Sequence, residues 1–285
     1  MAILPIQLMN GLFAASVLLL VSIGMVVIFG NMNVVNLAHG EFIMAGAYTA
    51  WGLCELGLPF SLSVIGAFAL TAILGALCER LVIKRFYARL EETLLATYAI
   101  SVIMTQIARL LFSSMKKLVP LPVSGGLSIG SLVFPAYNFV VIAVAVFVVL
   151  FVCVLFYKTG LGKKIRAIRQ NRQMAQCLGI NTAVTDTISF GLGCGLAGLA
   201  GAIIAPLKIV YPAMGSAYLM DSFSTVVVGG VDSFVGTAMA SGLISESTSV
   251  LGGFMSEIYA QIIVLIGIIL VLRFRPNGLF SKEKR

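Results

Sequence analysis

The sequence predicts an all-α protein, a polytopic transmembrane helix bundle of about eight to nine spans with broken helices. Of its 285 residues, 60% are hydrophobic and 11% are charged, whereas soluble domains carry about 25% charged residues. The mean hydropathy is +1.07. This composition excludes an ordinary soluble enzyme, a disordered tail and a nucleic-acid-binding module. We therefore interpret residues 1–285 as one multi-pass membrane domain.

The spans follow from apolar runs, most of them near the roughly 20 residues that cross a bilayer. These runs lie at 8–29, 40–58, 62–83, 93–112, 136–157, 185–207, 222–253 and 257–272. The run at 222–253 is too long for one span. The segment Gly229-Gly-Val-Asp-Ser233 interrupts it, so we expect two short helices there.

A second interruption resembles the first. Segment 33–46 can be aligned with segment 229–242 so that three positions correspond: Asn36 with Asp232, Gly40 with Gly236, and Gly46 with Gly242. Non-helical backbone persists at membrane depth only against protein or water, and broken helices often line transporter paths. We expect helix breaks at Gly40 and at Gly229, Gly230 and Gly236, with chance matching of glycines as the alternative to an internal repeat.

Basic residues predict the orientation. No Lys or Arg precedes Arg80, and later ones gather at 80–89, at 158–172 and in the tail 273–285. Cytoplasmic loops carry an excess of Lys and Arg. We therefore expect a cytoplasmic C-terminus, an external N-terminus and an external loop at 113–135.

The residues that enzymes use are scarce. There is one histidine, and the five cysteines are widely spaced without a C-x-x-C pair, so we predict neither a metal site nor catalytic residues. Gly160-Leu-Gly-Lys-Lys164 is not a phosphate-binding loop. We expect no cofactor on this chain, and any ATP that drives it must bind to another subunit.

The basic segment 160–180 has an apolar side. It reads as a helix that Gly179 ends. One interpretation is a solvated loop, but that leaves its apolar residues unexplained. The other is a short coupling helix that docks on a cytoplasmic ATPase. We assign this role to Arg166, Arg169, Met174, Ala175, Leu178 and Gly179.

Polar residues inside spans are costly and suggest function. Hydroxyl residues recur every four positions in the fourth run, and polar groups flank both interruptions. We predict a substrate path lined by Asn33, Asn36, Thr97, Ser101, Thr105, Asp221, Ser222 and Thr225. Hydrogen bonding between helices is the equal alternative for the hydroxyls. For His39 and Glu41 a structural role is favoured, because an anion suits a first helical turn.

Four motifs together resemble the permease subunits of ABC importers for branched-chain amino acids and urea. They are Gly30-x5-Asn-Leu-Ala-His-Gly-Glu41, Arg169-Gln-Asn-Arg-Gln-Met-Ala175, Val226-Val-Val-Gly-Gly-Val231 and Arg275-Pro-Asn-Gly-Leu-Phe280. Local matches such as Thr93-Leu-Leu-Ala-Thr97 are most similar to the urea branch. Asp232-Ser233 departs from the pattern of many relatives.

The resemblance implies a permease domain in the bacterial inner membrane, in contact with lipid. It also implies several partners: a second related permease, two ATP-binding subunits and an extracytoplasmic solute-binding protein. Urea is the expected solute, because a small neutral molecule needs hydrogen-bond partners but no fixed charge. The alternatives are a branched-chain amino acid importer and a passive channel for a small neutral solute. A channel would need no docking helix.

Overall fold

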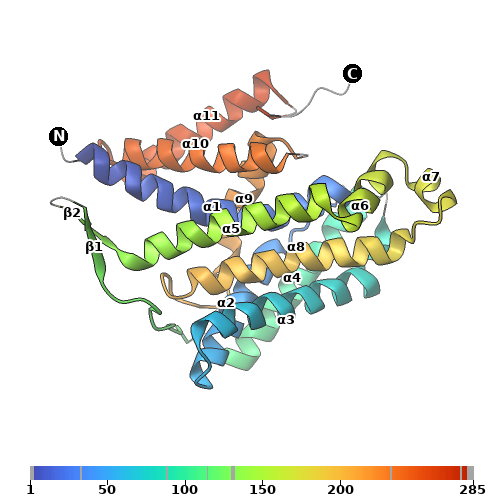
Figure 1. The fold of residues 1–285 in the computed structure, drawn as a ribbon, viewed down its shortest axis with the longest axis horizontal. Coiled ribbons are helices and arrows are strands. Elements are labelled where there is room, and N and C mark those ends of the chain that lie inside the picture. The colour runs from blue at the N-terminus through green and yellow to red at the C-terminus, as the bar shows by residue number, and fades with distance from the viewer. Residues whose placement is uncertain are drawn as a thin grey trace.

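The computed structural model describes residues 3–32, 34–87, 89–113, 115–129, 132–231, 233–276 and 278–280. These residues form an antiparallel hairpin and a helical bundle (Figure 1). The membrane helices are α1 (Ile3–Met32), α2 (His39–Glu55), α3 (Phe60–Leu81), α4 (Leu90–Phe112), α5 (Ala136–Lys158), α8 (Thr182–Ile204), α9 (Gly215–Gly229), α10 (Phe234–Gly252) and α11 (Glu257–Phe274). The short elements are η1 (Ile83–Phe86), α6 (Gly160–Gln170), α7 (Arg172–Cys177), β1 (Gly126–Ile129) and β2 (Leu132–Pro135).

The predicted helical membrane bundle is confirmed. Six of these helices, α1, α3, α4, α5, α8 and α11, are long and apolar enough to span a membrane. Helices α9 and α10 together qualify as one span broken by a bend of 118°. Helix α2 has 17 residues. Adding α2 and counting the bent pair as one span gives eight segments, and counting α9 and α10 separately gives nine, the predicted range.

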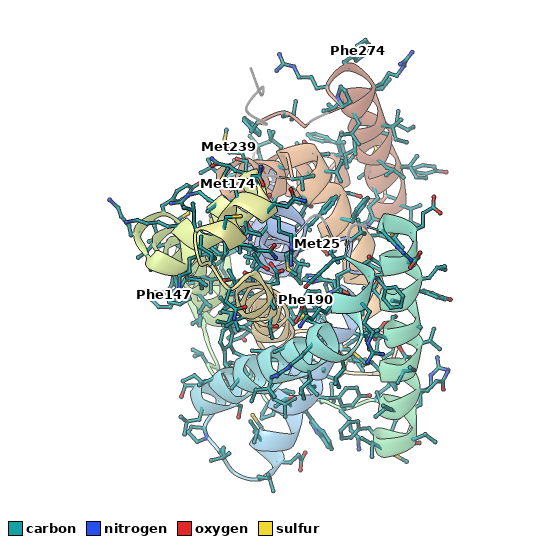
Figure 2. All side chains as sticks on the ribbon, turned by 90° about the vertical axis from the view of Figure 1, so that its right-hand side faces the viewer. Met25, Phe147, Met174, Phe190, Met239 and Phe274 are labelled. Carbon is teal, nitrogen blue, oxygen red and sulfur yellow. The ribbon has the colours of Figure 1, made fainter. Side chains whose placement is uncertain are left out.

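Helix α8 forms the centre of the bundle. It packs against α1, α2 and α3, and it is the most buried of the six long helices. Figure 2 shows Phe190 of α8 and Met25 of α1 in the interior, whereas Phe147 and Phe274 lie at the periphery. The hydrocarbon core of a bilayer surrounds apolar side chains favourably. Lipid contact therefore explains the many exposed Leu, Ile and Phe side chains.

The loop between α4 and α5 contains a hairpin that the sequence analysis did not predict. Strands β1 and β2 pair antiparallel with Gly126 opposite Pro135. Earlier in the loop, Lys117 exchanges two backbone hydrogen bonds with Val210, at 2.9 and 3.0 Å. Its ammonium group lies 4.6 Å from the centre of the Trp51 ring. These contacts hold the loop against the C-terminal part of α2 and the segment that joins α8 to α9.

The two ends of the bundle differ in charge. The start of α1 and the hairpin lie at one end, and the basic α6 and α7 lie at the other (Figure 1). We predict that alkaline phosphatase inserted at the hairpin is active and that the same enzyme fused after Arg285 is inactive, because positive loops stay in the cytoplasm. The reverse activities would contradict the predicted orientation.

Candidate functional site

The first helix break lies between α1 and α2. The Asn36 side chain accepts a hydrogen bond from the Ala38 amide at 3.0 Å, which forms a local turn. His39 Nε2 lies 2.8 Å from the Val21 carbonyl oxygen and donates to it. This bond ties the start of α2 to α1 in the buried interior. Asn33, a predicted path residue, lies outside the described residues.

Glycine lets the two broken segments approach each other closely. A Cβ atom at Gly40 would lie 2.3 Å from the Gly215 carbonyl oxygen, and one at Gly215 would lie 2.1 Å from the Gly40 oxygen. Gly40 is a point where α2 and α9 cross closely. It is the second residue of α2 and not a residue of the turn, where it was predicted. The correction follows from helix α2 beginning at His39.

The second break lies at Gly229 and Gly230 as predicted, but Gly236, also predicted there, is the third residue of α10, because that helix begins at Phe234. Helix α9 ends at Gly229, Gly230 adopts φ +97°, and α10 begins at Phe234. A Cβ atom at Gly236 would lie 2.1 Å from the Gly229 oxygen. The tail covers this turn, since the Leu279 amide donates to the Val228 carbonyl at 2.8 Å. That contact joins two of the motifs from distant parts of the sequence.

The hydroxyl stripe on α4 divides between two environments. Thr97 is buried and accepts from the Leu37 amide at 3.2 Å, so it holds the first break. Ser101 donates to Glu41 Oε1 at 3.2 Å. Thr105, one turn further, makes a side-chain contact with the same carboxyl. The structure thus brings the stripe to the first break, with Glu41 as the shared polar partner.

The predicted path residues on α9 do not all face the same surroundings. Ser222 and Thr225 are buried, and each donates to a carbonyl one turn back: Tyr218 for Ser222, and Asp221, at 2.7 Å, for Thr225. The Asp221 side chain is exposed on the surface of this subunit. Neither hydroxyl bonds to α4.

The coupling segment is two helices, not the single helix predicted. Asn171 separates them because its side chain caps α7 by accepting from the Met174 amide at 2.9 Å. The segment ends at Gly179, with φ +78°, as predicted. Ala175 is buried. Met174 and Leu178 are 58% and 73% exposed.

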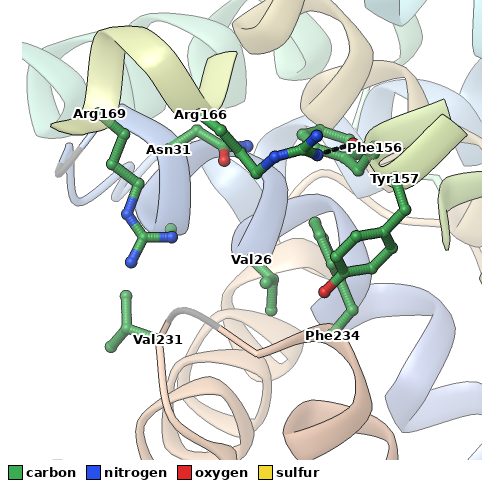
Figure 3. A pocket seen from close by; sticks show the side chains of 9 residues that line it. Val26, Asn31, Phe156, Tyr157, Arg166, Arg169, Val231 and Phe234 are labelled. Carbon is green, nitrogen blue, oxygen red and sulfur yellow. Dashed lines mark hydrogen bonds between the residues drawn. The ribbon is translucent and has the colours of Figure 1, made fainter. Parts of the chain in front are cut away.

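A small cavity of about 130 Å³ separates α6 from the second break (Figure 3). Arg166 and Arg169 line it together with Asn31, Tyr157 and Val231. Arg166 donates to the Phe156 carbonyl, while Ile165 and Ile168 are buried under the helix. The predicted coupling residues on α6 therefore lie against the bundle, whereas Met174 on α7 and Leu178 just after it face outward and Ala175 is buried.

A polar cluster joins α7 to the bundle. Arg172 forms an ion pair with Asp186 of α8 at 2.5 Å, and its guanidinium lies 5.2 Å from the centre of the Tyr87 ring. Tyr87 donates to the fully buried Glu79 of α3. Burial and this hydrogen bond raise the pKa of Tyr87 well above its usual range.

The sequence analysis did not select this cluster. Thr187 completes it by donating to Glu79 Oε2 at 2.5 Å. Both Glu79 and Asp186 stand inside apolar spans, and that placement was the available signal. The cluster connects the segment that we assign to ATPase coupling with α3 and α8, on which α2 packs.

Within the described part of the chain, no group of three or more His, Cys, Asp or Glu side chains could hold a metal ion. The polar groups of the two breaks offer hydrogen-bond donors and acceptors, together with one buried carboxylate. Such an arrangement can bind and pass a polar solute.

Comparison with known proteins gives one consistent family. Residues 7–272 match the family model described as the permease component of branched-chain amino acid transport systems. The chain is 29% identical to the branched-chain amino acid permease BraD of Pseudomonas aeruginosa, covering 98% of this chain and 96% of that protein. It is 28% identical to the probable branched-chain amino acid permease LivH of Methanocaldococcus jannaschii, covering 93% and 89% of the two chains.

Two further matches differ from these relatives, one in the solute of its name and the other in its lower sequence identity. The autoinducer 2 import permease LsrD of Salmonella paratyphi B is 27% identical over 82% of this chain and 69% of its own. A solved structure, PsaBC from Streptococcus pneumoniae in complex with Fab, is 14% identical with a TM-score of 0.50 and covers 92% of this chain and 90% of its own. That likeness concerns the fold alone.

Proposed function

Because the chain belongs to the permease-component family of branched-chain amino acid transport systems, we propose that it is the membrane subunit of an ATP-driven importer of branched-chain amino acids. The observation that carries this proposal is the family match over residues 7–272. The relatives named for branched-chain amino acids also span nearly the whole chain. Urea, the solute expected from the local motifs, has no such support, so the amino acid replaces it as the main proposal.

The proposal includes partners. Two exposed apolar side chains lie at this surface, Met174 on α7 and Leu178 directly after it. Apolar groups at a cytoplasmic surface suit a protein partner, and we assign them to an ATP-binding subunit. A second related permease, a second ATPase subunit and an extracytoplasmic binding protein complete the proposed importer. ATP binds only to the ATPase subunits.

We predict that the assembled importer, reconstituted in vesicles, accumulates labelled leucine only with both ATP and the binding protein. Concentrating a solute against its gradient needs an energy source, which this chain does not supply. The measurement is leucine uptake with and without ATP, with labelled urea as the parallel arm. Uptake of urea but not leucine would restore the urea hypothesis, and equilibration of either solute without ATP would indicate a channel.

A further inference from the structure

The carboxylate of Glu41 is incompletely satisfied in the interior. Only 6% of this residue is exposed. Its Oε1 accepts from Ser101 at 3.2 Å, but its Oε2 is buried without a hydrogen-bond partner. In the described part of the chain, no Lys or Arg side chain pairs with it. A buried polar atom left without a partner is destabilising, so its retention at membrane depth suggests a ligand.

The position of Glu41 fits a solute path. Ser101 is midway along α4 (Leu90–Phe112), so its bond to Glu41 lies near the middle of the bilayer. Helix α4 is mostly exposed and contacts the bundle mainly through α2 and η1. A solute passing between α2 and α4 would therefore meet this carboxylate together with the Ser101 and Thr105 hydroxyls.

Other unsatisfied groups lie on the same turn. Asn36 Nδ2 and His39 Nδ1 are buried, and neither has a hydrogen-bond partner. His39 is held in place by its bond to Val21. The start of α2 thus presents an amide donor, an imidazole nitrogen and a carboxylate within six residues. The first turn of α2 does not need this many polar side chains for the stability of the helix.

We propose that Glu41, with Ser101 and Thr105, forms the subsite that receives the ammonium group of the transported solute. An ammonium carries three N–H donors and no acceptor, which matches one free carboxylate oxygen and two hydroxyl oxygens. Charge-assisted hydrogen bonds of this kind are the strong ones. The inference deepens the proposed function and rests on it for the identity of the solute, because amino acids carry such a group and urea does not.

The first test measures uptake. In the reconstituted importer, Glu41→Gln keeps the size and hydrogen-bonding capacity of the side chain but removes its charge. We expect leucine uptake to fall about tenfold or more, as loss of a charge-assisted bond predicts. The matched control is Glu246→Gln on α10, where a half-buried carboxylate also has an unpartnered oxygen. Its uptake should stay within about twofold of the wild type.

The second test reads the local charge directly. Ser101→Cys is introduced into a chain whose five cysteines are replaced by alanine, and the new thiol is treated with aminoethyl or sulfonatoethyl methanethiosulfonate. We expect the cationic reagent to react about tenfold faster than the anionic one, leucine to slow the reaction, and Glu41→Gln to abolish the preference. If Glu41→Gln does not assemble, Glu41→Asp, which keeps the charge, should retain the reagent preference while uptake falls.

The outcomes separate this inference from the proposed function. Normal leucine uptake by Glu41→Gln overturns the subsite. Equal reaction rates of the two reagents, or a preference that leucine does not affect, also overturn it. If the wild type imports no branched-chain amino acid, the proposed function is wrong. The reagent preference at Ser101→Cys then still decides whether Glu41 presents a negative charge to the path.

Discussion

Replacing Met174 and Leu178 together by Asp is expected to abolish ATP-driven leucine uptake, with a loss of about a hundredfold or more. Both side chains are largely exposed, at 58% and 73%, so the substitutions should not disturb the bundle. They place two negative charges where a complementary partner would have an apolar pocket. Burying unpaired charge in an interface is strongly unfavourable. The measurement is uptake, with co-purification of the ATPase subunits as the direct readout of docking.

The matched control is Gln173→Asp, which adds a charge to the same helix at a position that is already polar and exposed. Uptake by this variant should remain near the wild-type level. If the double variant retains the ATPase subunits and transports leucine normally, α7 is not the docking element. The exposed pair would then have to be explained by other contacts.

Apolar periodicity predicted most of the fold because span length and hydropathy are local properties. The runs at 62–83 and 136–157 became α3 (Phe60–Leu81) and α5 (Ala136–Lys158) with shifts of no more than two residues. The break after Gly229 was also predictable, since consecutive glycines interrupt a helix wherever they stand. The hairpin at 126–135 was not, because its strands are four residues each and merge with the apolar start of α5.

The candidate site was predicted only in part. Spacing placed the hydroxyls of α4 on one face, but it could not say that Thr97 binds the backbone at Leu37 while Ser101 binds Glu41. Those partners are about sixty residues away in sequence, and the fold alone brings them together. The bond between Glu79 and Thr187 was missed for the same reason, whereas Tyr87 lies only eight residues from Glu79 in sequence.

The kink in the coupling segment has a local cause that the sequence contained. Asn171 is a good capping residue, and its side chain caps α7, which begins at Arg172. The sequence analysis treated 160–180 as one helix because its basic and apolar positions continue across Asn171. Helix propensity is a weak guide at such a site, where the capping bond of one side chain decides the outcome.

Gly40→Ala is expected to destabilise the protein by about 2 kcal/mol or more. A Cβ atom at this position would lie 2.3 Å from the Gly215 carbonyl oxygen, well inside van der Waals contact. The obstacle is backbone on both sides, so no side-chain rotation relieves it. Helices α2 and α9 would have to separate, which would shift Glu41 as well as the second break. The measurement is the midpoint of thermal unfolding of the purified protein, followed by leucine uptake.

Gly242→Ala provides the matched control, because Gly242 lies inside α10 with no heavy atom within 4 Å of an added Cβ. The same substitution there should leave stability unchanged or raise it by about 0.5–1 kcal/mol, since Ala is the better helix former. A difference in stability between the two variants therefore measures the close contact between α2 and α9, and not the preference of Ala over Gly for a helix. Equal unfolding midpoints would mean that α2 and α9 can separate at no expense, and the close approach of the two broken segments would then not fix the site.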